Sequence, residues 1–147
     1  MRLEDLNKKF KTISGYEKIF LKKNKEGKKD FQRLEFLGDK VLGLVISSII
    51  YNKYKNFSEG SLSRAVAYLC SGKVLSDIGV SLKLDVLLNK KKRNISEKVL
   101  ADNMEVIIGA YYIKNGFVKT KKIIYEIWKE EIINIIMVNL DNKTALQ

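Results

Sequence analysis

The sequence contains no histidine, no proline and only one cysteine among its 147 residues. Without histidine, neither a Ser-His-Asp nor a Cys-His catalytic group can be assembled within one chain, and zinc sites are excluded in the same way. The single cysteine, Cys70, excludes an internal disulfide, and we expect it to be a small core residue. These absences leave metal-assisted hydrolysis or a non-catalytic role.

Long hydrophobic runs are also missing. The first residues, MRLEDLNKKFKT, are charged throughout and lack the apolar segment of a signal peptide. The apolar stretches further along are interrupted by Gly, Ser, Asn or charged residues well before they reach membrane-spanning length. We therefore expect no membrane association and, with one cysteine, a cytoplasmic location.

The absence of proline and the recurrence of apolar residues at helical intervals predict a single all-α domain with short connections. Ser58, Ser71 and Ser96 are expected to cap helices, and Asn115-Gly116 to end one. The basic segments 22–30 and 89–96 read as loops. A stripe of isoleucines around Trp128 predicts core or subunit contact. The expected helices cover about residues 3–9, 16–23, 32–54, 59–69, 72–78, 81–88, 97–114 and 117–137.

Two pairs of carboxylates carry the strongest functional signal. Glu35 with Asp39, and Asp102 with Glu105, are spaced so that each pair lies on one helix face. Both pairs interrupt apolar runs, where an ordinary solvated acid is not expected. Four clustered carboxylates repel one another unless a cation or protons neutralise them, and an all-oxygen site favours Mg²⁺ or Mn²⁺.

The chain is strongly basic, with 28 Lys and Arg against 17 Asp and Glu, a formal charge of +11. This charge attracts polyanions such as nucleic acid, although the bias of an AT-rich genome toward lysine would explain it equally well. Together with the acids, the charge favours a nuclease, since phosphodiester cleavage uses basic residues to hold the backbone and a metal for the chemistry.

These segments resemble the catalytic domain of bacterial ribonuclease III over essentially the whole chain. The central match is RLEFLGDKVL at residues 33–42, which is close to that family's signature segment. Further matches are EGSLSR at 59–64, LADNMEVIIGAYYIKNG at 100–116, and DNKTALQ at 141–147. The last resembles the linker before the family's double-stranded-RNA-binding domain, so we expect a catalytic domain at residues 1–138 and the start of a linker at 139–147.

The resemblance implies that Glu35, Asp39, Asp102 and Glu105 are the family's metal-cluster acids, with Asp39 and Glu105 most essential to catalysis. It implies that Glu35, Asp102 and Glu105 contact Mg²⁺, for which Mn²⁺ can substitute, and that one or two ions are used. Glu59 would lie close to the active site, although at a helix start it could equally serve the helix dipole.

The resemblance further implies a homodimeric endoribonuclease that cuts double-stranded RNA to leave 5'-phosphate and 3'-hydroxyl ends, in the processing of ribosomal and messenger RNA precursors. No small-molecule cofactor is expected. Phe36 is our candidate for an aromatic dimer contact; without the family it would read as core. The basic run Lys90, Lys91, Lys92 and Arg93 is our candidate for RNA-backbone contact. Gly38 and Gly109 predict close helix packing beside the acids.

Some positions depart from the family pattern. Gln32 stands where the family usually has an acid, which predicts altered rate or site choice. Lys40 replaces a small residue and could pair with an acid or contact phosphate. Residues 20–24 replace a histidine-containing segment.

Three alternatives to this assignment remain. The chain could resemble Mini-ribonuclease III, an rRNA maturation enzyme without the RNA-binding domain. It could instead be a non-catalytic double-stranded-RNA-binding scaffold of the same fold. A phosphohydrolase acting on small nucleotides is disfavoured, because no Gly-rich phosphate loop is recognisable.

Overall fold

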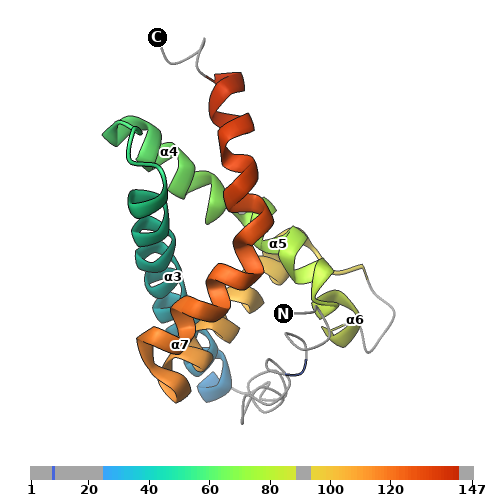
Figure 1. The fold of residues 1–147 in the computed structure, drawn as a ribbon. Coiled ribbons are helices and arrows are strands. Elements are labelled where there is room, and N and C mark those ends of the chain that lie inside the picture. The colour runs from blue at the N-terminus through green and yellow to red at the C-terminus, as the bar shows by residue number, and fades with distance from the viewer. Residues whose placement is uncertain (1–7, 9–24, 89–93, 143–147) are drawn as a thin grey trace.

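The computed structural model describes residue 8 and residues 25–88 and 94–142, and this part of the chain is helical without a single strand (Figure 1). The all-α prediction is therefore confirmed. Apart from residue 8, the helices expected at residues 3–9 and 16–23 lie outside the described residues, as do Lys90–Arg93. The helices are α3 (Lys25–Lys53), α4 (Glu59–Leu69), α5 (Gly72–Ser81), α6 (Leu84–Leu88) and α7 (Glu97–Asn142).

Serine side chains start three of the helices, as the sequence predicted. The Ser58 hydroxyl accepts a hydrogen bond from the backbone N–H of Ser61 at 3.2 Å, and that of Ser71 accepts one from Val74 at 3.3 Å. Ser96 caps α7 in the same way. Each serine satisfies a backbone donor that the first turn of a helix leaves without a partner.

The prediction of a basic loop at residues 22–30 is wrong for its described part, because α3 begins at Lys25 rather than near Gln32. A single glycine, Gly27, does not break the helix, and the flanking lysines and acids are good helix formers. Glu26 in the first turn also interacts favourably with the helix dipole. The first acid pair therefore lies in the third and fourth turns of α3 instead of at its beginning.

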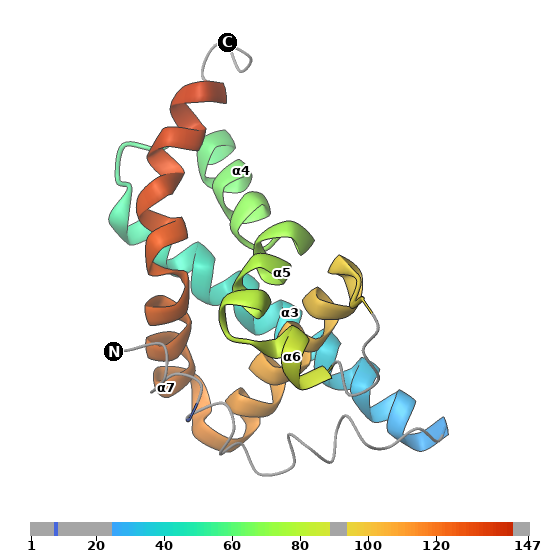
Figure 2. The same cartoon turned by 90° about the vertical axis from the view of Figure 1, so that its right-hand side faces the viewer.

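The expected break near Gly116 is a sharp kink within α7. Gly116 has φ 78° and ψ 178°, a conformation that side chains other than glycine rarely adopt. The Thr120 hydroxyl donates to the Gly116 carbonyl at 2.7 Å, in the first turn after the kink. After the kink, α7 turns back and its second half passes α4 toward the C-terminus (Figure 2). It continues through Asn142, so residues 139–142 of the expected linker are helical.

Another boundary differs in the middle of the chain. Helix α5 runs to Ser81, and the next helix, α6, begins at Leu84 rather than at Ser81. Between them Lys83 has φ 59°, the left-handed conformation that reverses the chain direction. Short helices of this kind have too few residues for their ends to be read from apolar spacing.

The core lies where α3 and both halves of α7 meet α4 and α5. Helix α3 packs most extensively on α7, and α5 also packs on α7. Ile123, Ile124, Ile132 and Ile135 around Trp128 are buried, which confirms these members of the isoleucine stripe as core, whereas Ile133 is exposed. Cys70 is half-buried against this core. The largest fully buried side chains are those of Trp128, Leu42, Ile46, Ile50, Leu69, Ile78, Met104, Ile108, Ile124, Ile132, Ile135 and Val45.

None of the helices in the described ranges is both long and apolar enough to cross a lipid bilayer.

Trp128 ties the second half of α7 to the end of α4, since its indole N–H donates to the Leu69 carbonyl at 2.9 Å. Replacing Trp128 with phenylalanine should lower the free energy of unfolding by roughly 2 kcal/mol, because a buried carbonyl loses its donor and a cavity opens. Urea unfolding measures this change. Tyr68→Phe, at an exposed neighbouring position, should change stability by less than about 0.5 kcal/mol. Equal effects of the two substitutions would contradict this role for Trp128.

Candidate metal centre

The two carboxylate pairs lie side by side because α3 and α7 touch at two glycines. A Cβ atom on Gly38 would overlap the Glu105 carbonyl group and lie 3.0 Å from the Gly109 backbone nitrogen. A Cβ atom on Gly109 would overlap the Leu34 carbonyl oxygen. The predicted close packing at these glycines is therefore observed, and it places the backbones of the two acid-bearing helices in direct contact.

Three of the four predicted acids form a compact group. Glu35, Asp102 and Glu105 are half-buried, and one carboxylate oxygen from each lies within 4.8 Å of the others. We call these three residues the carboxylate triad. Asp39 lies outside it, with 54% of its side chain exposed and its carboxylate 3.6 Å from the Lys40 ammonium. Of the two roles considered for Lys40, the ion pair is the one seen.

Burial and mutual repulsion raise the pKa of two members of the triad, Glu105 and Glu35. Burial, followed by the charge of Asp39, raises the pKa of Glu105 to about 8. Burial and then the charge of Asp102 also raise the pKa of Glu35, which Lys98 partly opposes. A site in which burial and repulsion between carboxylates raise the pKa of Glu105 in this way is well suited to a cation. Its all-oxygen donor set fits Mg²⁺ or Mn²⁺ better than zinc or copper.

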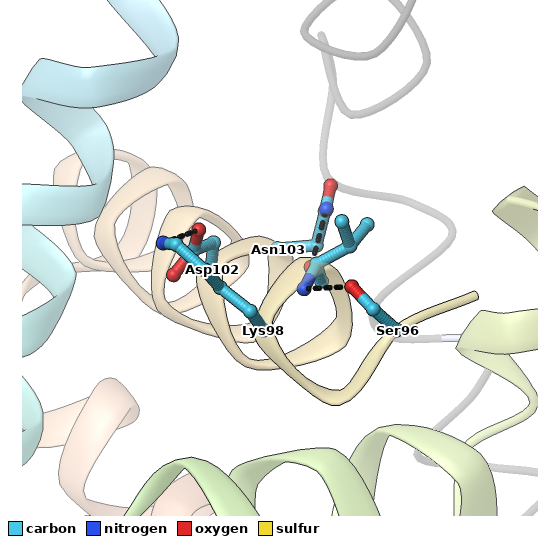
Figure 3. Close-up of polar contacts among 5 residues, drawn as sticks. Ser96, Lys98, Asp102 and Asn103 are labelled. Carbon is cyan, nitrogen blue, oxygen red and sulfur yellow. Dashed lines mark hydrogen bonds and ion pairs between the residues drawn. The ribbon is translucent and has the colours of Figure 1, made fainter.

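A lysine that the sequence analysis missed contacts the triad. The Lys98 ammonium donates to Asp102 at 2.8 Å, one helical turn before it in α7 (Figure 3). This hydrogen bond and the charge of Asp102 raise the pKa of Lys98, so the ammonium remains charged. The i,i+4 spacing of Lys98 and Asp102 was the signal in the sequence that could have revealed the pair.

The start of α7 is held on its other side by neutral hydrogen bonds. The Ser96 hydroxyl accepts from the Val99 N–H at 3.2 Å, and the Asn103 amide donates to the Val99 carbonyl at 2.7 Å (Figure 3). Asn103 is buried, and its side-chain oxygen has no hydrogen-bond partner within the described residues. These contacts fix the first turns of α7, from which Asp102 and Glu105 project.

The remaining predicted residues do not belong to the triad. Gln32 is exposed on α3, one turn before Glu35. Glu59 is the exposed first residue of α4, a position that suits the dipole interpretation. Phe36 is 65% exposed, so the alternative of an ordinary core residue is wrong. The Lys40 ammonium lies 5.7 Å from the centre of the Phe36 ring.

Comparisons with known proteins agree with this arrangement. A family model described as the ribonuclease III domain matches residues 32–116. A protein named ribonuclease 3 from Pelagibacter ubique is 34% identical over 97% of this chain and 68% of its own length. Ribonuclease 3 from a Francisella tularensis strain is 38% identical over 82% of the chain, which spans 55% of that relative's length.

Solved structures of similar fold include a ribonuclease III nuclease domain from Campylobacter jejuni. It is 28% identical, with a TM-score of 0.60 over 82% of this chain and 96% of its own. A second structure of that nuclease domain, whose description refers to a region involved in dimer formation, has 33% identity and a TM-score of 0.62 over 68% of this chain and 74% of its own. Dicer from Pichia stipitis has a TM-score of 0.70 at 27% identity, over 84% of this chain and 57% of its own.

Proposed function

Because this chain belongs to the ribonuclease III family, we propose that it is an endoribonuclease that hydrolyses phosphodiester bonds in double-stranded RNA with Mg²⁺. The observation that carries the proposal is the carboxylate triad, built on the contact between α3 and α7 in a protein of formal charge +11. Carboxylates that bind a cation and a basic surface that attracts phosphates are the two requirements of metal-assisted phosphodiester cleavage.

In this proposal Glu35, Asp102 and Glu105 hold the metal. The chemistry that the bound ion would supply is neutralisation of charge on the phosphate and activation of a water molecule as the nucleophile. Asp39 lies near enough to Glu105 to raise its pKa, and its exposed carboxylate would accept a hydrogen bond from the attacking water. In-line attack that breaks the bond to the 3' oxygen would leave 5'-phosphate and 3'-hydroxyl ends.

RNA recognition in this proposal depends on the shape of the A-form duplex and on its phosphates, because its deep major groove hides the bases. The Lys90–Arg93 run remains a proposed backbone contact. Gln32 and Glu59 are proposed auxiliary residues on the strength of the family resemblance, and both stand exposed on their helices. Processing of ribosomal and messenger RNA precursors and a cytoplasmic location stay predictions.

The substrate is tested with end-labelled double-stranded RNA, single-stranded RNA of the same sequence and duplex DNA, each in Mg²⁺ at low salt and again with a chelator. We expect cuts in the RNA duplex only, and none with the chelator. Equal cutting of all three substrates would contradict the specificity. Metal-independent binding of the RNA duplex without cuts would favour the non-catalytic scaffold.

We also propose a homodimer in which Phe36 contacts the partner. Its exposed ring lies on α3, where Leu44, eight residues further along the helix, is also exposed. Large apolar side chains left exposed on one helix are typical of a contact surface rather than of a solvated face. Two triads in a symmetric dimer would suit the two strands of a duplex.

Replacing Phe36 with serine should shift the protein toward the monomer, because the contact loses its largest apolar side chain. Sedimentation velocity over a range of protein concentrations measures the shift. Val86→Ser is the matched control, since Val86 is 69% exposed on α6, away from α3. A variant that remains as dimeric as the control would contradict the role of Phe36.

The extent of the domain is a further proposal. We propose that residues 1–138 form the catalytic domain and that 139–147 lead toward a double-stranded-RNA-binding domain. The start of this segment prolongs α7. An enzyme of the Mini-ribonuclease III type is the alternative, and appending an RNA-binding domain would distinguish them by how much it strengthens duplex binding.

A further inference from the structure

Lys98 occupies a distinctive position in the candidate metal centre. Its ammonium lies 2.8 Å from Asp102 Oδ2, an oxygen of one triad member. Its charge also interacts with those of Glu35 and Glu105, so it acts on the whole triad. The Lys98 ammonium therefore neutralises part of the negative charge of the three carboxylates, as a bound metal ion would.

The ammonium and a divalent cation would compete for the same atom. An ammonium donates to the carboxylate lone pairs, and a hard cation coordinates through those lone pairs as well. A cation that takes up Asp102 must therefore either displace Lys98 or bind beside its positive charge. Both routes weaken binding of the cation.

Displacing Lys98 from Asp102 requires little free energy. The Lys98 side chain is 80% exposed, whereas that of Asp102 is only 24% exposed. A flexible lysine stem can swing into water, and exposed ion pairs of this kind are weak. The Asp102 carboxylate, in contrast, has much less exposed surface along which to move.

Resting on the proposed function, we propose that Lys98 is an exchangeable counter-ion of the carboxylate triad, which neutralises it in the metal-free protein and lowers its affinity for a divalent cation. Lys98 is thus a positioning residue that acts through Asp102. In this role it keeps the metal-free triad assembled and sets the metal concentration at which the site fills.

The test is the affinity of the protein for Mn²⁺, measured by titration calorimetry without RNA. Lys98→Met keeps the aliphatic stem and removes the charge, so it should bind Mn²⁺ about three- to tenfold more tightly than the parent protein. Lys98→Arg keeps the charge and should bind within about twofold of the parent. If Lys98 were needed only for folding, Lys98→Met would instead bind Mn²⁺ more weakly than the parent protein, because damage to the site weakens metal binding.

Helix α5 provides a matched control. Lys73 and Asp77 form an ion pair of the same i,i+4 spacing at 3.3 Å, with side chains 72% and 64% exposed, and neither residue belongs to the triad. Lys73→Met should leave Mn²⁺ affinity unchanged. Equal or weaker binding by Lys98→Met, in a parent protein that binds Mn²⁺, would overturn the counter-ion role alone. Failure of the parent protein to bind Mn²⁺ would overturn the proposed metal site together with this inference.

Discussion

Replacing Glu105 with glutamine should nearly abolish RNA cleavage and at the same time stabilise the metal-free protein at pH 8. The amide keeps the size of the side chain and removes one of three charges that would hold the metal. Loss of such a preorganised electrostatic group typically costs roughly 10²- to 10³-fold in rate. Cleavage of labelled RNA duplex at saturating Mg²⁺ measures this effect, with Lys73→Met as the control that should cleave normally.

The stability half of the prediction follows from the pKa of Glu105, which burial and then the charge of Asp39 raise from 4.5 to about 8. The native protein therefore retains this proton over a pH range in which the unfolded chain has lost it. Stability of the metal-free protein should fall as the pH rises from about 4.5 to about 8, and this contribution should level off outside that window. Glutamine cannot ionise, so the variant should lose most of the slope.

Urea unfolding with a chelator at pH 5, 6.5 and 8 tests this behaviour. The parent protein and Glu105→Gln should differ most at pH 8, because the raised pKa of Glu105 has by then cost the parent protein most of this contribution to stability. Burial also raises the pKa of Glu35 and of Glu131, so a small slope in the same direction should remain. A variant with the full slope of the parent would assign the effect to those groups and not to Glu105.

Alanine at Gly38 should lower the free energy of unfolding by about 3 kcal/mol or more, the upper part of the range for overpacking. Its Cβ would meet the backbone carbonyl of Glu105, which cannot rotate away, so α3 and α7 would have to separate. The separation would also move Glu35 from Glu105 and should abolish stabilisation by Mn²⁺. Thermal unfolding with and without Mn²⁺ measures both effects.

Gly43 gives this experiment its control, five residues further along the same helix. A Cβ atom there would meet nothing within 4 Å. Gly43→Ala changes helix propensity in the same way as Gly38→Ala and should stabilise the protein by roughly 0.5–1 kcal/mol. Effects of the same sign at both positions would show that contact between the helices does not explain the need for glycine at residue 38.

The sequence predicted those parts of the fold that local chemistry determines. Helix α4 has the predicted bounds because Ser58 caps it and its apolar positions recur with the helical period. The start of α3 was misjudged because one glycine in a basic segment looks like a loop. The helix propensity of the neighbouring residues is high enough to accommodate this glycine, and only the folded structure shows that the helix extends through it.

The arrangement of the site was less accessible from sequence. Spacing places Glu35 and Asp39 on one helix face, but the rotation of α3 against α7 makes Glu35 a member of the triad and leaves Asp39 more exposed. The same rotation exposes Phe36. Both outcomes depend on packing between segments some sixty residues apart, which no local pattern contains.

The contact at Gly38 and Gly109 links occupancy of the site to the opening of the whole domain. With the two backbones touching, the triad cannot come apart while α3 and α7 remain docked. A bound cation would then hold α3 and α7 together at the most extensive contact between helices. Its binding free energy would add to the free energy of unfolding the whole domain, rather than to that of a local opening. Hydrogen exchange should therefore slow by one common factor along both helices when the cation is added, so that the site reports on the integrity of the fold.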